Sequence, residues 1–156
     1  MVQTRLAQIS DASELKKLND LFNGEDSATI EIIKKSLEEN TQEIVCVAAE
    51  VNGQTSKLVG FCCGQIVKSM CYTILYGDIT EFFVIEEYLS QDIAKQLIKQ
   101  IEIEFYKRRV NHLHHLTGTD NAPVQELYRS LGYTDTTQSS YGSSSIAIFE
   151  KDTVKK

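Results

Sequence analysis

The stretch VIEEYLSQDIAKQLI, residues 84–98, has the pattern of a strand that leads directly into a helix. A helix N-terminus exposes unpaired backbone N–H groups and carries partial positive charge, so such a junction can hold a phosphate. Ser90 can cap this helix, and Ala94 is small enough for a close approach. Asp92, however, would repel a phosphate at the same N–H groups, while stabilising the helix by itself. On these residues alone, a purely structural junction is favoured over an anion site.

Three histidines, His112, His114 and His115, form a second group with possible chemistry. Alternate residues of a strand share a face, so His112 and His114 would point the same way and could bind zinc. Neither a carboxylate nor a cysteine near them in the sequence completes a ligand set. We therefore expect no metal site, and a strand whose histidines face solvent or pack.

The third segment with possible chemistry is TDNAPVQELYRSLGY, residues 119–133. Asn121 can cap a helix, Leu127 and Leu131 lie on one face, and Gly132 ends it. A helical tyrosine such as Tyr128 is usually a packing residue. The combined spacing of these residues makes Tyr128 a candidate functional residue.

The elements that must position these residues follow from hydrophobic periodicity and turn signals. Asn52-Gly53 between two apolar runs predicts an antiparallel hairpin. Early hairpins followed by strand–helix alternation indicate an α/β fold with a mixed sheet. The expected order is a strand (3–9), helices (10–22, capped by Asp11 or Ser13, and 27–40), strands (43–51, 57–67 and one or more within 72–85), a helix (90–109), a strand (111–120), a helix (122–133) and a last strand (144–151), with room for one more after Tyr133.

The bulk properties predict one soluble domain, residues 1–156. The net charge of −6 argues against nucleic acid as a partner; it either favours a cationic substrate or only serves solubility. No apolar run reaches the roughly 20 residues that span a bilayer, and no signal peptide is visible, so we expect a cytoplasmic protein without a membrane partner. The cysteines are expected to be buried thiols in a reducing compartment: Cys46, Cys62, Cys63 and Cys71.

The third segment, with the element order, resembles the GNAT superfamily of acyl-CoA-dependent N-acetyltransferases. That family's signature has Asn, an aliphatic residue three positions on, Leu-Tyr, then Gly and an aromatic residue. The matching residues here are Asn121, Val124, Leu127-Tyr128 and Gly132-Tyr133. The run KLVGFCCGQ is similar to the family's third strand. The resemblance covers about residues 2–151 and implies a mixed, mostly antiparallel sheet of six to seven strands flanked by about four helices.

The resemblance implies that acetyl-CoA is the cosubstrate and that residues 84–94 form its loop. Ala94 fits the loop pattern, but Glu86, Leu89 and Asp92 replace the proline, the Arg/Gln and the first glycine. Lys95 and Gln91 could offset some of the lost positive character. The residues implied in acetyl-CoA binding are Phe83, Val84 and Ile85 through their backbone, the amides of Gln91, Asp92, Ile93, Ala94 and Lys95 at the pyrophosphate, and Asn121.

The resemblance also implies direct attack by an amine on the thioester. Tyr128 is the candidate acid for the leaving thiolate, and a backbone amide near Val84 could bind the thioester oxygen. Glu81 is the candidate base, with Asp78 second, although Glu81 can equally be a solvated strand residue. The expected acceptor is a primary amine of a small molecule, and only the net charge of −6 favours a cationic one. A homodimer is expected because dimers are frequent in the family.

Two other hypotheses remain open at this point. The altered loop suggests a GNAT-fold protein with weakened catalysis that serves as an acyl-CoA-binding or protein-interaction module. The other is an α/β domain without any CoA site.

Overall fold

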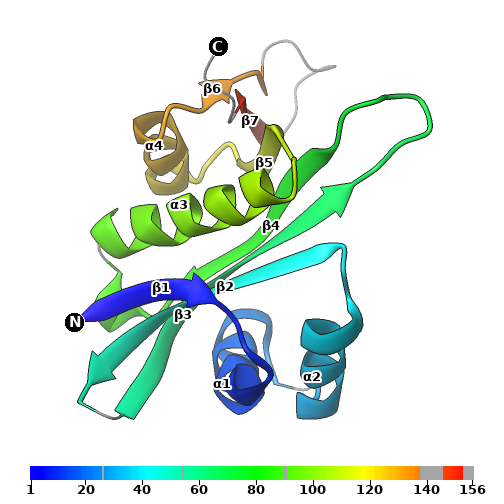
Figure 1. The fold of residues 1–156 in the computed structure, drawn as a ribbon. Coiled ribbons are helices and arrows are strands. Elements are labelled where there is room, and N and C mark those ends of the chain that lie inside the picture. The colour runs from blue at the N-terminus through cyan, green and yellow to red at the C-terminus, as the bar shows by residue number, and fades with distance from the viewer. Residues whose placement is uncertain (26, 54, 90, 138–145, 153–156) are drawn as a thin grey trace.

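The computed structural model describes residues 1–156 except 26, 54, 90, 138–145 and 153–156 (Figure 1). The expected element order is confirmed, with short 3-10 helices added before α1 and α3. The elements are β1 (Val2–Leu6), η1 (Ile9–Asp11), α1 (Ala12–Asn23), α2 (Ile30–Glu39), β2 (Glu43–Asn52), β3 (Thr55–Val67), β4 (Tyr76–Val84), η2 (Glu86–Tyr88), α3 (Gln91–Lys107), β5 (His112–Gly118), α4 (Ala122–Ser130), β6 (Thr134–Asp135) and β7 (Ile146–Asp152).

The strands form one seven-stranded sheet in the order β1-β2-β3-β4-β5-β7-β6. Every neighbouring pair is antiparallel except β4 and β5, which are parallel. The predicted mixed, mostly antiparallel sheet is therefore confirmed. The predicted hairpin at Asn52-Gly53 joins β2 to β3, and Gly53 has the positive φ (63°) that this turn requires. The strand that the sequence allowed after Tyr133 is β6 at the sheet edge.

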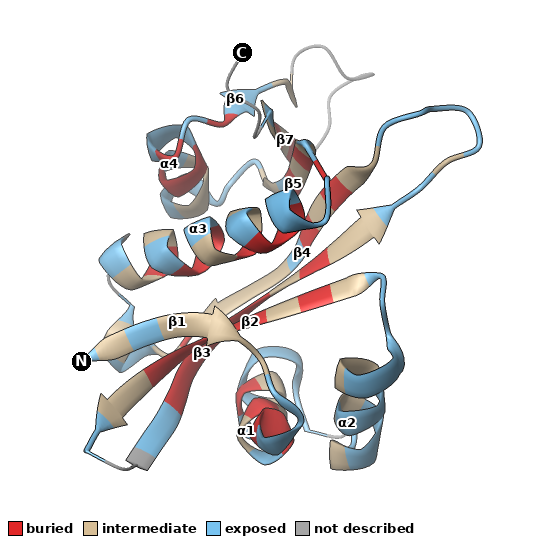
Figure 2. Ribbon diagram, in the orientation of Figure 1, coloured by how far each residue is buried: buried red, intermediate tan, exposed pale blue. Residues whose placement is uncertain are grey.

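Helices cover both faces of the sheet (Figure 1). On one face, α3 and α4 pack with a core that includes residues of β2, β3 and β4. On the other face, α1 and α2 pack over a smaller core. The buried stripe of α3 faces the sheet in Figure 2, and Leu97, Ile101 and Phe105, spaced by four as predicted, are fully buried. No helix in the described ranges is long and apolar enough to cross a membrane.

The start of α1 differs from the prediction. Asp11 is at the N-cap position, but its side chain does not cap the helix, and Ser13 lies within the helix. The Asp11 carboxylate instead accepts hydrogen bonds from the Gln8 amide (2.7 Å) and from the guanidinium of Arg5 (2.7 and 2.9 Å). A nearby cation and an amide thus outcompete the capping bond, and they tie the helix start to β1.

The expectation of four buried thiols is only partly correct. Cys46 and Cys62 are buried in the sheet, and Cys63 is half-buried. Cys71 is exposed, because it lies in the connection between β3 and β4 and not in a strand. Sequence reasoning placed it in a strand because of its apolar neighbours.

Candidate active site

Strands β4 and β5 pair over only part of their lengths. Their parallel register runs from Tyr76↔His112 to Ile79↔His115 and stops there. Beyond it, residues 81–84 pair only with β3, and residues 116–118 pair only with β7. We call the point after Ile79 and His115 the β4–β5 fork. Such an interrupted ladder leaves backbone polar groups along its inner edges without a strand partner, which suits a ligand with an amide-rich arm.

The edge of β4 at the fork presents the backbone of Val84. Gly60 pairs with Val84, and the next amide, that of Ile85, donates to the Val59 carbonyl of β3 (2.9 Å). Backbone groups of successive strand residues point to opposite edges, so those of Val84 and Phe82 point toward the fork. Three residues were expected to bind acetyl-CoA through their backbone. This alternation places only the amide of Val84 on the fork edge. The amide of Ile85 is already engaged, and that of Phe83 points toward β3 as well.

A β-bulge sets the orientation of β4 at the fork. The register with β3 shifts between Cys63↔Glu81 and Gly64↔Ile79, which leaves Thr80 as the extra residue. A bulge redirects the side chains that follow it. As a result, Glu81 points to the α1/α2 face, while Phe82 packs on the α3 side.

Tyr128 of α4 lies at the fork on the α3/α4 face. Its ring stacks on that of His115, with centroids 4.0 Å apart, and His115 is the last β5 residue paired with β4. The side chain is 1% exposed, and its hydroxyl has no hydrogen-bond partner among the described residues. Burial raises the pKa of Tyr128 well above its ordinary value, so the phenol is protonated at neutral pH. A buried hydroxyl without a partner costs stability, so this one calls for an explanation.

His115 is a residue that sequence reasoning left without a role. It lies on the opposite face of β5 from His112 and His114, beneath α4, and it is buried. Its Nδ1 lies 3.1 Å from the Ile79 carbonyl, which can only accept, so Nδ1 carries the hydrogen. Burial lowers the pKa of His115 to about 4, so the ring is neutral. His115 thereby holds the two strands together where they separate and supports the Tyr128 ring.

Glu81 lies on the opposite face from Tyr128 and lines a cavity of about 230 Å³ between the sheet and helices α1 and α2. Its carboxylate accepts a hydrogen bond from the Thr80 hydroxyl. Glu43 also lines this cavity, with its two oxygens engaged by Ser36 (2.6 Å) and Gln65 (3.1 Å). The cavity lining contains two carboxylates and, among the described residues, no lysine or arginine. It therefore suits a cation.

One cavity residue bears on covalent chemistry. Cys63 lines the cavity as well. Burial, followed by the charges of Glu43 and Glu81, raises the pKa of the Cys63 thiol well above its ordinary value. Because the thiolate is the nucleophilic form, this cysteine is a poor acyl carrier.

The junction before α3 is longer than expected. The 3-10 helix η2 intervenes between β4 and α3, and Tyr88 in it donates to Glu50 of β2 (2.6 Å). Asp92 lies exposed in the first turn of α3, and Ala94 is buried against the core. Ser90, expected as the cap, lies outside the described residues. Leu89 is 62% exposed, so a large apolar side chain stands beside the helix start.

The start of α4 matches the expectation. The Asn121 side chain accepts from the Val124 amide (3.4 Å) and so caps the helix, and a proline follows in the first turn. The side chain of Gln125 donates to the Gly118 and Thr119 carbonyls (both 3.0 Å), which fixes α4 to the end of β5. The cap and this contact set the position of Tyr128.

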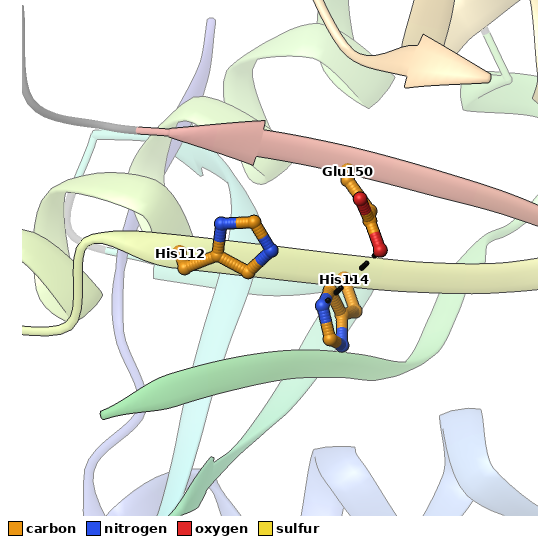
Figure 3. A group of neighbouring side chains, drawn as sticks. All are labelled: His112, His114 and Glu150. Carbon is orange, nitrogen blue, oxygen red and sulfur yellow. Dashed lines mark ion pairs between the residues drawn. The ribbon is translucent and has the colours of Figure 1, made fainter. Parts of the chain in front are cut away.

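His112 and His114 share a face of β5, as their spacing predicted (Figure 3). The sequence showed no carboxylate near these histidines, but the fold places three carboxylates beside them. Glu150 and Asp152 come from β7 and Asp78 from β4, and they contact the imidazoles at 2.7 to 3.5 Å. Because these residues are 34 or more positions away from the histidines in the chain, only the strand order could have revealed the group.

The buried tyrosine and the cavity thus lie on opposite faces of the sheet, with the fork between them. The model of the acetyltransferase (GNAT) family matches residues 11–133. The chain therefore belongs to the GNAT acetyltransferase family, whose enzymes use acetyl-CoA as cosubstrate. No curated protein sequence matches this chain.

Solved structures show the same fold. A GNAT-family acetyltransferase from Streptococcus pneumoniae has a TM-score of 0.75 at 18% identity, over 97% of this chain and 99% of that one. Arabidopsis thaliana NAA60 in complex with acetyl-CoA has a TM-score of 0.71 at 16% identity, over 97% of both chains. The NatC complex bound to Gag peptide and CoA has a TM-score of 0.67 at 16% identity, over 96% of this chain and 95% of that one.

Proposed function

We propose that this protein transfers an acetyl group from acetyl-CoA to a primary amine of a small, cationic molecule. The observation that carries the proposal is the buried, unpartnered hydroxyl of Tyr128 at the β4–β5 fork. A protonated phenol at that place can donate to a leaving thiolate, and no partner in the described protein competes for it. The family, whose cosubstrate is acetyl-CoA, supports the same reaction.

The donor would lie in the fork. The Val84 amide, directed to this edge of β4, is the candidate donor to the thioester oxygen, whose negative charge grows as the amine attacks. The backbone amides in the first turn of α3, Gln91 to Lys95, would face the pyrophosphate. Asn121 would contribute by fixing the start of α4. Each of these groups lies in β4, in the first turn of α3 or at the start of α4.

The acceptor would occupy the cavity beside Glu81. The amine attacks the thioester carbon and the C–S bond breaks; Glu81 takes the proton of the amine, and Tyr128 returns one to the thiolate sulfur. Acid and base thus act from opposite faces of the sheet through the fork. The high pKa of the Cys63 thiol supports direct transfer without an acyl-enzyme.

The size and charge of the cavity favour the acceptor class. Its volume of about 230 Å³ fits a slender alkylamine, and its carboxylates, Glu43 and Glu81, complement positive charge. The Gag peptide of the NatC complex points to a peptide N-terminus as another acceptor class. A peptide would leave more of its chain outside this cavity than a small amine. A panel of linear polyamines, aminoglycosides and short peptides, assayed by thiol release, separates these classes. Peptide turnover above that of every small amine would overturn the small-amine assignment.

A second candidate function is an acyl-CoA-binding module with weak catalysis. The observation that favours it is the α3 start, where exposed Asp92 and Leu89 replace the expected glycine and arginine or glutamine. Calorimetry with acetyl-CoA tests both functions. Saturable heat together with amine-dependent thiol release supports the enzyme, and heat without thiol release for any amine favours the module. No heat at millimolar acetyl-CoA would reject both, because a ligand of the native state must be detectable as binding or stabilisation.

A further inference from the structure

The imidazoles of β5 and the carboxylates of β4 and β7 form a polar group on the open face of the sheet. His112, His114 and Glu150 each offer a ligand atom, and these atoms lie within 4.8 Å of one another (Figure 3). We infer that these three residues form a binding site for a divalent transition metal, with zinc as the best match.

The register of β5 and β7 creates this arrangement. His114 pairs directly with Glu150, and His112 pairs with Asp152 two positions further along the antiparallel ladder. Side chains of paired residues lie on the same face at short range, so both imidazoles and Glu150 converge. In Figure 3 the ring of His112 turns one nitrogen toward His114 and Glu150. All three residues are half-buried, so their rotamers are limited by packing but the group remains reachable from solvent.

Each imidazole is also held by a carboxylate at its other nitrogen. His112 Nδ1 is 2.7 Å from Asp152 Oδ1, and His114 Nδ1 is 3.3 Å from Asp78 Oδ1. A hydrogen on Nδ1 leaves the lone pair of Nε2 free, and His114 Nε2 already lies 3.5 Å from Glu150 Oε1. Metal-binding histidines characteristically donate their second N–H to a carboxylate in this way. The arrangement therefore supplies both the ligands and the groups that orient them.

The ligand set and its spacing favour zinc over a harder cation. Two imidazoles and one carboxylate are a common zinc set with one position left open, whereas calcium and magnesium prefer oxygen ligands alone. Zinc ligands at about 2.0–2.2 Å from a tetrahedral ion are roughly 3.4 Å from each other. The observed spacing of up to 4.8 Å therefore closes with small side-chain rotations.

Charge around the group favours a cation as well. With neutral imidazoles, the carboxylates of Asp78, Glu150 and Asp152 carry three negative charges. The nearest basic residue of β7, Lys151, is on the other face and contacts Glu102 and the Leu131 carbonyl. A cavity of about 450 Å³ is lined by His112, Asp152 and Arg109, among others. This cavity gives an ion, and a fourth ligand, a route from solvent.

The test uses the folded protein with zinc, and it needs no acetyl-CoA. A Cys71→Ser background removes the exposed thiol, which would otherwise bind zinc by itself. Calorimetric titration should give one saturable zinc site, and cobalt in its place should give the visible absorption of a low-coordinate N/O site. Since His115 is buried on the opposite face, any imidazole-bound metal must use the β5 pair.

Matched variants locate the ion. Zinc binding should weaken more than about tenfold in Glu150→Gln and in the double variant His112→Gln/His114→Gln, which lose ligands. It should weaken about tenfold in Asp152→Asn, which loses a group that orients a ligand. Glu126→Gln, an exposed carboxylate on α4, should leave the affinity unchanged. Circular dichroism checks that each variant is folded. Equal zinc affinity in the double-histidine variant and its background, or the absence of saturable binding in the background, would overturn the inference.

Discussion

The starts of helices α4 and α3 flank the proposed donor site, and they differ sharply. The α4 start has its expected cap, Asn121, and it leads to a fully buried Tyr128 against the fork. The α3 start has an exposed Asp92 in its first turn and an exposed Leu89 before it. Under the proposed function, the α4 region would supply the acid for the reaction, whereas the α3 region would bind the cosubstrate with a carboxylate and an apolar side chain beside it. We expect substitutions in the first region to change turnover or stability, and those in the second to change affinity.

The largest effect is expected from removing the Tyr128 hydroxyl. Tyr128→Phe should lower kcat by about 10²-fold or more, because a general acid typically contributes that factor. The fold should persist, since the ring packing remains and an unpartnered buried hydroxyl is lost. The matched control is Tyr133→Phe, which removes another buried tyrosine hydroxyl on the same side of the sheet and should leave kcat unchanged. Equal kcat in wild type and Tyr128→Phe would remove the acid role.

The next effect concerns the base on the opposite face. Glu81→Gln should lower kcat by roughly 10²-fold near neutral pH, with partial recovery as the pH rises and more of the amine is unprotonated. Glu43→Gln, in the same cavity, should mainly raise KM for the amine, since it contributes charge without accepting the proton. Steady-state kinetics over a pH series distinguish the two variants. If Glu81→Gln changed KM alone, Glu81 would be a binding residue.

A moderate effect on stability is expected at the α4 cap. Asn121→Ala should lower the free energy of unfolding by about 1 kcal/mol, because the Val124 amide loses its side-chain acceptor. Asn121→Ser keeps an acceptor oxygen and should retain most of the stability. Urea denaturation measures both. Equal midpoints for Asn121→Ala and wild type would show that packing of Leu127 and Tyr128 holds this helix without the cap.

The smallest effect is expected at the α3 start. Asp92→Asn should tighten CoA binding about two- to fivefold, since a charge in the first turn of a helix is worth roughly 0.3–1 kcal/mol. Asp92→Glu keeps the charge and is the matched control. Calorimetry with CoA at low ionic strength gives the largest difference. Unchanged or weaker binding in Asp92→Asn would reject the electrostatic comparison between the two helix starts.

Much of this architecture could be predicted from the sequence because its signals are local. The stripe of α3, the Asn52-Gly53 hairpin and the Asn121 cap depend on residues within a few positions of one another. Other features depend on strand order. The carboxylates around His112 and His114 come from β4 and β7, and no local spacing connects them. The same holds for His115, whose burial beneath α4 follows from the position of β5 in the sheet.

Competing hydrogen-bond partners and a strand boundary explain the local errors. Asp11 was expected to cap α1, but Arg5 and the Gln8 amide engage its carboxylate instead. Cys71 has apolar neighbours, yet it is exposed because the chain leaves the sheet between β3 and β4. In the first case nearby competing partners, and in the second the end of β3, override the preference of the short segment.

The central claim is that the β4–β5 fork and Tyr128 support acetyl transfer to an amine. The most direct measurement is the initial rate of thiol release from acetyl-CoA with increasing concentrations of a linear polyamine, for wild type and for Tyr128→Phe. We expect saturable, amine-dependent release by the wild type that falls about 10²-fold in the variant. Release that is independent of amine, or equal in the two proteins, would contradict it.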